Sequence, residues 1–477
     1  MTSVPATRAA TARAEKSFDR AIVEGPIARA VWALAWPTML QNVIGGLQGM
    51  VDHALVGHFV GYAANAAIGV GFQIFLVVMV FVSSLFTGMS VHVARYAGAN
   101  QPEKVNRTVY QAFISSVGLC LFVLAPLGWV LAPSLLGLVH ATAAVQAEAL
   151  PYLRIMFTSS LGMMLYFMFG AALRSAGDAR TPLRLGVLLT ALNVGFNVIL
   201  IPGLGPIPRL GAAGAAIGMS LAGLVVSGIA AWLLLSGRLV VRWHRGMNWR
   251  PDWQVIRSLF RFGLPTGVQG IAMNIAGVLL LRYIGSLAES AQAQAAYAVG
   301  YTELFSLITW TSVGLMGAAA AVAGQNLGAD RPERSIKGVH VAAGIGLCVA
   351  AVVGILFLAI PGALLGLFGM RDAVVLRIGA QLLSFLCISG MFITVALTYT
   401  GGLQGTGDTR SPLVISIVSQ LGVPLGICAA LSSVRPLQPA DIWLAILLGH
   451  VTRCGLSVLR FRQGKWRAIR LESLSRG

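Results

Sequence analysis

Long apolar segments separated by short polar loops repeat along almost the whole chain. The apolar runs between polar breaks predict twelve helices. They cover residues 31–58, 66–95, 107–132, 147–174, 182–202, 211–236, 258–284, 292–325, 335–360, 373–402, 411–433 and 439–461. A helix needs about 20 apolar residues to cross a bilayer, and each segment reaches that length. The pattern therefore predicts an all-α integral membrane protein with twelve transmembrane helices.

The composition supports the same class. Of the 477 residues, 57% are hydrophobic and only 10% are charged, whereas soluble domains carry about 25% charged residues. A soluble globular enzyme is therefore excluded. The five cysteines lie inside apolar segments without metal-site spacing, so we interpret them as buried hydrophobic residues and expect neither disulfides nor a metal site.

The net charge of +18 is distributed unevenly along the chain. Of the 34 Lys and Arg residues, 27 fall in the two tails and in the loops that follow the even-numbered helices. This bias follows the positive-inside rule and predicts that both termini lie in the cytoplasm, with the protein in the plasma (inner) membrane. The basic residues do not form a soluble patch interleaved with aromatics, so we expect no nucleic-acid partner.

Two halves of the chain repeat each other. GANQPEKVNR at 98–107 matches GADRPERSIK at 328–337, and LRSAGDARTPL at 173–183 matches LQGTGDTRSPL at 403–413, both 230 residues apart. Pro37-Thr38 and Pro265-Thr266 match at nearly the same offset. An even number of helices between equivalent positions makes the two units parallel, around a central cleft such as secondary transporters use. A duplicated channel or receptor scaffold remains the structural alternative.

This repeat divides the chain into five parts. We expect a cytoplasmic N-terminal tail, an N-lobe of helices 1–6, a basic cytoplasmic linker, a C-lobe of helices 7–12 and a cytoplasmic C-terminal tail. They cover residues 1–30, 31–236, 237–257, 258–461 and 462–477. The two GDxR segments, at 177–180 and 407–410, are expected to be tight turns before the next helix.

Four segments carry a resemblance to a known family. They are GLQGMVDHALVG from Gly46, RSAGDARTP at 174–182, VAGQNLGADRPER at 322–334 and QGTGDTRSP at 404–412. With them the chain resembles the MATE (multidrug and toxic compound extrusion) transporters, in their prokaryotic DinF-like branch. The resemblance implies a V-shaped pair of lobes and export of amphipathic, often cationic, drugs in exchange for protons or sodium. A lipid-linked oligosaccharide flippase of the same superfamily is the alternative.

The chain offers little that would suit an enzyme. It contains no GxxxxGK[ST] phosphate loop, which argues against an ATP-driven pump, and no nucleophile motif inside a span. We therefore expect a transporter that needs no cofactor apart from its coupling ion. Its expected partners are small-molecule drugs or metabolites and the lipid bilayer, and we expect a monomer.

Only two carboxylates, Asp52 and Glu303, lie well inside apolar spans. A charged group at the centre of a membrane helix costs about 2.5–3.5 kcal/mol, so such a residue is usually functional. Gln41, Gly45, Gln48 and Asp52 follow helical spacing and share one face of the first helix. Thr190, Asn193 and Asn197 do the same on the fifth helix. Desolvation would favour a protonated Asp52, while hydrogen bonds to its carboxylate would oppose this.

The resemblance identifies these residues as the coupling site. Asp52 and Asn193 match the family's aspartate on helix 1 and asparagine on helix 5. Many members have a second aspartate where this chain has Asn197. Because sodium prefers several hard oxygens, some of them charged, one remaining carboxylate favours proton coupling. We expect Asp52, Asn193, Asn197, Gln48 and Thr190 to carry it, and sodium remains the alternative ion.

The remaining candidates belong to the substrate pathway and to a hinge. We assign Gln41, Glu303, Gln269, Asn274, Tyr301 and Met164 to the pathway. Glu303 has an alternative role as an ion-pair partner of Arg282 or Arg453, and the Met- and aromatic-rich run around Met164 suits either a promiscuous pocket or ordinary packing. Pro37 is the candidate hinge, because a proline inside a helix permits bending. Its alternative is a plain helix start.

Overall fold

The computed structural model describes residue 18 and residues 20–60, 62–138, 142–206, 208–244 and 246–471. Within these ranges the chain forms helices and no strand. Among the described helices, ten are long and apolar enough to cross a membrane, or eleven if one bent pair is counted as a span. The first long helix falls below this test because Gln41, Asn42 and Gln48 interrupt its apolar run. With it, the chain has the twelve predicted spans in two six-helix lobes.

The N-lobe is built from the first six spans. Their elements are α2 (Ile27–Phe59), α3 (Tyr62–Gly98), α4 (Pro102–Leu119) with α5 (Ala125–Leu138), α6 (Ala143–Thr158) with α7 (Ser160–Ser175), α8 (Arg180–Leu200) and α9 (Gly211–Leu235). A π-helical turn, Cys120–Leu124, joins α4 to α5. The pair α6 and α7 forms a span bent by 51°.

The C-lobe repeats this plan with the last six spans. Its elements are α10 (Trp253–Gly285), α11 (Ser290–Tyr297) with α12 (Ser306–Gly328), α13 (Pro332–Ala359) with α14 (Pro361–Leu367), α15 (Ala373–Thr406), α16 (Arg410–Ser416) with α17 (Val423–Ser432), and α18 (Pro439–Arg462). Ala298–Leu304 and Ile417–Gly422 are π-helical. A short helix, α1 (Ala21–Glu24), precedes the first span.

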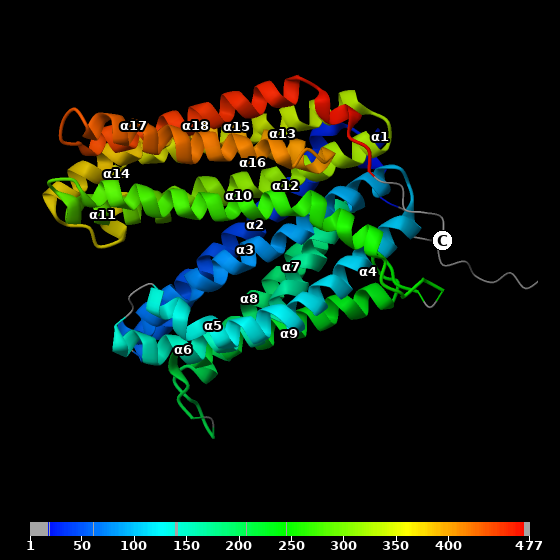
Figure 1. Cartoon of the computed structure of the whole chain (residues 1–477), viewed down its shortest axis with the longest axis horizontal. Coiled ribbons are helices and arrows are strands. Elements are labelled where there is room, and N and C mark those ends of the chain that lie inside the picture. The colour runs from blue at the N-terminus through cyan, green and yellow to red at the C-terminus, as the bar shows by residue number, and fades with distance from the viewer. Residues whose placement is uncertain are drawn as a thin grey trace, which may run out of the picture.

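The two lobes form two layers that meet at one end. In Figure 1 they approach each other on the right, near α1 and α4, and separate on the left, where α11 and α14 lie opposite α5 and α6. Helix α3 packs on α10, and α2 packs on α12. Each lobe has its own apolar core, and a third core joins the first half of α2 to α12 and α13.

Glycines allow the lobes to touch backbone to backbone at the end where they meet. A Cβ at Gly88 would lie 1.9 Å from the Leu259 carbonyl oxygen, and one at Gly263 would lie 2.3 Å from that of Ser84. Between α3 and α12, Gly98 and Gly328 make equally close contacts. Small residues permit such approach between membrane helices, where dispersion replaces the hydrophobic effect. This contact therefore holds the lobes together at the end that carries α1.

Both GDxR segments form the predicted turns. Gly177 has φ of 102° and Gly407 has φ of 98°, a conformation open to glycine without strain. Asp178 accepts a hydrogen bond from the Thr181 backbone N–H at 2.9 Å. Asp408 accepts one from Ser411 at 3.2 Å and pairs with Arg460. Each aspartate therefore caps the helix that follows.

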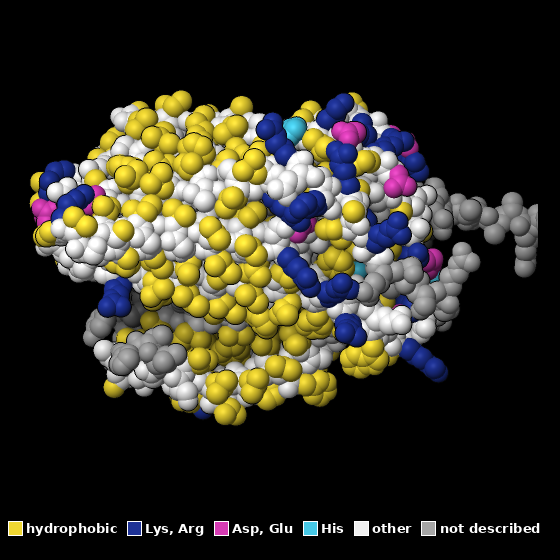
Figure 2. All heavy atoms as spheres, turned by 45° about the horizontal axis from the view of Figure 1, so that its top comes forward, with side chains coloured by type: hydrophobic (Ala, Val, Ile, Leu, Met, Phe, Trp, Pro, Cys, Tyr) yellow, Lys and Arg dark blue, Asp and Glu magenta, His cyan; other side chains and the backbone are white. Residues whose placement is uncertain are grey.

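The surface has the charge distribution of a membrane protein. Figure 2 shows apolar side chains over the middle of the visible face and Lys and Arg gathered toward its right-hand end, with a smaller group at the left. The exposed apolar residues include Trp129, Val130, Val352 and Ile355, each more than half exposed. An apolar belt of this extent does not occur on soluble monomers, so these side chains face lipid.

We predict that Gly263→Ala destabilises the protein because the new methyl group meets backbone. Overpacking at a rigid contact costs about 1–3 kcal/mol, so the apparent melting temperature in detergent should fall by several degrees. The matched control is Gly277→Ala on the same helix, where a Cβ meets nothing within 4 Å. The control should leave the melting temperature unchanged or raised. Equal melting temperatures for both variants would contradict the close contact between the lobes.

Candidate functional site

A hydrogen-bonded network connects α2 with α8 inside the N-lobe. Asn197 Nδ2 donates to Asp52 Oδ1 at 2.8 Å, and Asn197 Nδ2 also lies 3.4 Å from Asn193 Oδ1. Gln48 Nε2 donates to Asn193 Oδ1 at 2.9 Å, and Thr190 Oγ1 donates to Gln48 Oε1 at 2.8 Å. The structure thus brings together the five residues expected to carry coupling, whereas Gln41, on the same stripe of the first helix, lies outside this network.

The three amides of the network are buried, and Asp52 and Thr190 are half-buried. Asn193 is fully buried, Asn197 is 1% exposed and Gln48 is 7% exposed. Desolvation disfavours the charged form of a carboxylate, and hydrogen bonds from the amides favour it. Asp52 is held between these two effects.

The Asn193 amide fits its surroundings in two orientations. Turned by half a rotation, its Nδ2 donates to Asp52 Oδ1 at 3.1 Å, and its Oδ1 accepts from the Met219 backbone N–H at 3.2 Å. In the first orientation its oxygen accepts from Gln48 instead. The turned orientation supplies one more donor to Asp52. Either orientation links Asn193 on α8 to α2, through Gln48 in the one and through Asp52 in the other.

A glycine on α9 makes room for Asn197. A Cβ at Gly218 would lie 2.2 Å from Asn197 Oδ1 and 3.3 Å from the Phe196 Cβ. Asn197 Oδ1 is buried and has no hydrogen-bond donor among the described residues. Such an orphaned acceptor is rare in folded proteins. It is a group to which a protonated carboxyl, a water or a monovalent cation can bind.

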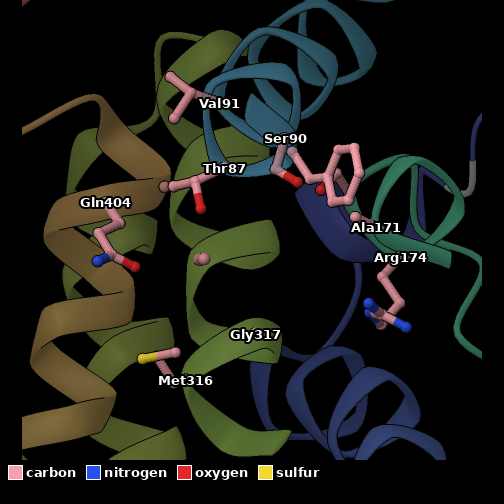
Figure 3. Close-up of a pocket in the computed structure, with 12 residues that line it drawn as sticks. Thr87, Ser90, Val91, Ala171, Arg174, Met316, Gly317 and Gln404 are labelled. Atoms are coloured by element: carbon pink, nitrogen blue, oxygen red, sulfur yellow. The ribbon is translucent and has the colours of Figure 1, made fainter. Parts of the chain in front are cut away.

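Gln41, the first polar residue of the stripe, belongs to a different cluster. Its Nε2 donates to the Tyr166 hydroxyl at 2.7 Å, and Arg174 Nη1 donates to its Oε1 at 3.3 Å. Arg174 also lines a cavity of about 170 Å³ between the lobes. Figure 3 shows Arg174 and Gln404 on opposite sides of this cavity, with Thr87 and Ser90 above. Sequence reasoning missed Arg174 because it stands beside the GDxR turn and was counted as a loop charge.

A second, larger cavity of about 740 Å³ lies where α3 faces α10 and α12. We call it the C-lobe cavity. It is lined by Gln73, Ile74, Val77, Ile271, Met273, Asn274, Ile275, Gly277, Val278, Leu279, Leu281, Tyr297, Tyr301, Thr302, Phe305, Ser306 and Thr309. Two of the predicted pathway residues, Asn274 and Tyr301, are therefore in its wall. Asn274 Oδ1 accepts from Gln73 Nε2 at 3.5 Å, which links the two lobes.

Three other predicted pathway residues lie away from this cavity. Gln269 is buried and donates to Ser416 Oγ at 2.7 Å. Met164 is fully buried in the N-lobe core, where it has a packing role. Glu303, in the π-helical turn, is not in the cavity wall. Among the described residues its carboxylate forms no ion pair within 4 Å, with Arg282 and Arg453 included, so the alternative ion-pair interpretation is not supported.

Pro37 lies inside a helix. Helix α2 begins at Ile27, ten residues earlier, so the alternative that Pro37 is a helix start is wrong. The Thr38 hydroxyl donates to the Leu34 carbonyl at 2.8 Å, as side chains often do near a proline. Pro265 stands inside α10 at the equivalent position of the second half.

The described residues offer no cluster of three His, Cys, Asp or Glu that would bind a metal ion. The network between α2 and α8 offers one carboxyl group with neutral oxygen and amide partners. Such a group can take up and release a proton, or contribute one charge to a monovalent cation. The C-lobe cavity offers aromatic and neutral polar surface to an amphipathic ligand.

Comparison with known proteins identifies this architecture. The family model described as MatE matches residues 37–199 and again residues 265–428, one match for each lobe. "Probable multidrug resistance protein NorM" of Thermotoga maritima is 27% identical over 91% of this chain and 92% of its own length. "Probable multidrug resistance protein YoeA" of Bacillus subtilis is 26% identical over 86% of this chain and 88% of its own length.

Solved structures agree on the fold. An outward-facing multidrug resistance MATE family transporter of the MOP superfamily superimposes with a TM-score of 0.87. It is 21% identical and the match covers 95% of this chain and all of the other. The two-lobed arrangement is therefore common to both, and the repeated family match gives the 228-residue period that the two proline pairs had indicated.

We predict that Gly218→Ala damages ion-coupled transport more than it damages folding. The added methyl group displaces Asn197 Oδ1, which is the flexible end of a side chain, so the helix packing can persist while the contact with Asp52 is lost. The control is Gly228→Ala on the same helix, where a Cβ meets nothing within 4 Å. Gradient-driven dye transport in proteoliposomes should fall several-fold in the first variant only. Equal transport by both variants would argue that the contact is dispensable.

Proposed function

Because this chain belongs to the MatE family, whose members here are multidrug resistance transporters, we propose that it exports amphipathic small molecules by alternating access in exchange for protons. The observation that carries this proposal is the buried network around Asp52. It supplies one titratable group, set among neutral amides and a hydroxyl inside the N-lobe.

Protonation of Asp52 has a direct structural consequence. As a carboxylate it attracts the N–H groups of Asn197 and of the turned Asn193. Once protonated it needs an acceptor, and the orphaned Asn197 Oδ1 is adjacent. The amides then turn, which changes how α2 packs on α8. We assign the protonated form to the outward-facing state, where it favours release of the drug.

The return step follows from differential proton affinity. A ligand shifts a conformational equilibrium only by its difference in affinity for the two states, and the proton is that ligand here. Deprotonation toward the cytoplasm restores the carboxylate and its amide donors. Pro37 supports the motion, because the missing hydrogen bond weakens α2 in the half of the helix that packs on α12, ahead of the network.

The orientation in the membrane is part of the proposal. Lys and Arg gather at the end where the lobes meet, together with α1 and the chain after α18. By the positive-inside rule this end faces the cytoplasm of an inner membrane. The lobes then separate toward the outside.

Sodium is the second candidate for the coupling ion, and one observation favours it. Asp52 and the unpaired Asn197 Oδ1 together offer a charged and a neutral oxygen in one buried place. Sodium sites use such oxygens as ligands. A single carboxylate, however, offers little negative charge to compensate a cation that must lose its hydration shell. The proton therefore remains the proposed ion.

We predict that Asp52→Asn abolishes proton-driven export while the protein still folds. The substitution removes the titratable group and keeps the shape and hydrogen-bonding capacity of the side chain. The measurement is uptake of a fluorescent dye by proteoliposomes under an imposed pH gradient, with folding checked by size-exclusion profile and melting temperature. Glu289→Gln is the control, since Glu289 forms an exposed ion pair with Arg377. Wild-type export by Asp52→Asn at equal protein content would refute the proposal.

We further predict that Asn197→Asp shifts the coupling toward sodium. A second carboxylate beside Asp52 raises the negative charge of the site and supplies the hard oxygens that sodium needs. In the same liposomes, a sodium gradient should then drive dye movement that it does not drive in the original protein. Sodium-driven movement already present without the substitution would show that sodium is the native coupling ion.

A further inference from the structure

The wall of the C-lobe cavity carries no charge. Its polar groups are the amides and hydroxyls of Gln73, Asn274, Thr302, Ser306 and Thr309, with two tyrosines, and the rest of the lining is apolar. A cavity built to hold cations would be expected to present a carboxylate. Here the nearest candidate in sequence, Glu303, is absent from the wall. Any preference of the cavity for ligands of one charge must therefore arise from charged residues that lie behind the lining residues.

An aromatic ladder forms one side of the cavity. Its members are Trp443, Tyr297, Tyr301, Phe305 and His450, with successive ring centroids 6.1, 4.9, 5.3 and 5.8 Å apart. Tyr297 and Tyr301 are stacked within 8° of parallel. Tyr297, Tyr301 and Phe305 reach the cavity, whereas Trp443 and His450 are buried behind. Such a wall suits a ligand with a flat aromatic ring.

A buried arginine stands behind this ladder. Arg453 on α18 is 5% exposed and stands three residues after His450, the last ring of the ladder, so the two side chains share one face of the helix. No carboxylate lies within 4 Å of it among the described residues, and its Nε has no hydrogen-bond partner. The carboxylate on the same helix, Asp441, pairs with Arg435 instead. Arg453 is therefore a positive charge without a counter-charge.

An uncompensated buried charge is costly, and natural proteins keep one only where something balances it. An anion in the C-lobe cavity would balance the charge of Arg453 across the aromatic ladder. Tyr301 can transmit the effect, since a phenol beside a cation turns its oxygen toward that cation and its O–H proton away from it. The same field opposes a cation in the cavity, against the attraction of the tyrosine faces.

We propose that the C-lobe cavity binds flat aromatic amphipaths that carry one negative charge, such as aryl carboxylates, in preference to cations of the same size. Arg453 supplies the counter-charge through the aromatic wall, and Asn274 and Gln73 offer hydrogen bonds at the opposite side. This assigns a substrate class to the exporter and rests on the proposed function only for the claim that the ligand is transported.

The test compares two probes that differ only in the sign of their charge. They are 1-pyrenebutyrate and a pyrenebutyl trimethylammonium salt, which share ring and chain. Binding to the full-length protein in phosphatidylcholine nanodiscs is followed by energy transfer from tryptophan to pyrene, without any ion gradient. We expect the anion to bind on the order of tenfold more tightly, as expected for one charge acting at an intermediate effective dielectric. Equal binding, or tighter binding of the cation, would overturn the proposal.

Variants then locate the origin of the preference. Arg453→Gln should abolish it, mainly by weakening pyrenebutyrate binding, and Arg453→Met should do the same without a hydrogen-bonding group. Neither leaves a buried charge unpaired, so the fold should tolerate both. The control is Arg462→Gln, an exposed arginine about 13 Å farther along α18. A preference that survives both substitutions at Arg453, or is lost in the control, would refute the role of Arg453.

The result is separable from the coupling mechanism. Asp52→Asn should keep the preference for the anion, because Asp52 is not in the cavity wall and binding is measured without a gradient. If export proves not to be driven by protons while the anion still binds better, the coupling proposal fails and this one stands. If Asp52→Asn abolishes export but the cavity binds the anion no more tightly than the cation, the coupling proposal stands and this one fails.

Discussion

The structure depends on the cost of placing one carboxylate inside a membrane lobe. Asp52 cannot be left to lipid or to an apolar core, since either would raise the free energy of the folded state by several kcal/mol. Asn197, Asn193 and Gln48 reduce that cost, and they are themselves buried polar groups that need partners. Gly218 on the next helix is then required to admit Asn197. One charge thus accounts for side chains on three helices.

The second lobe has the same helices and the opposite charge. Where the N-lobe buries Asp52 among amides, the C-lobe buries Arg453 behind aromatic rings. The helices were duplicated, as the paired family match demonstrates, but the buried charges were not. The equivalent spans also differ in their helical geometry. The second and fifth spans of the C-lobe each contain a π-helical turn, whereas their N-lobe equivalents, α3 and α8, contain none. Such turns are frequent at functional sites, and one of them carries Tyr301 and Glu303.

The fold could be predicted from the sequence because its signals are local or periodic. Apolar runs give the spans, and the two GDxR segments give the repeat, and neither requires knowledge of distant contacts. The Asp52 network could also be predicted, because helical spacing placed its members on facing stripes. Arg174 and Arg453 could not, since their roles depend on other helices: Arg174 contacts Gln41 on α2, and Arg453 has no carboxylate within 4 Å among the described residues. The same limit applies to Met164 and Gln269, whose burial depends on which way each helix is rotated.

Helix α2 connects these sites mechanically. Its first half packs on α12, where Asn42 donates to the Trp310 carbonyl at 3.1 Å and a Cβ at Gly46 would meet the Trp310 ring. Its second half carries Gln48 and Asp52 into the N-lobe. Trp310 follows Thr309, which lines the C-lobe cavity. Helix α2 and the Trp310 indole thus form a continuous packed connection between Asp52 and the edge of the cavity.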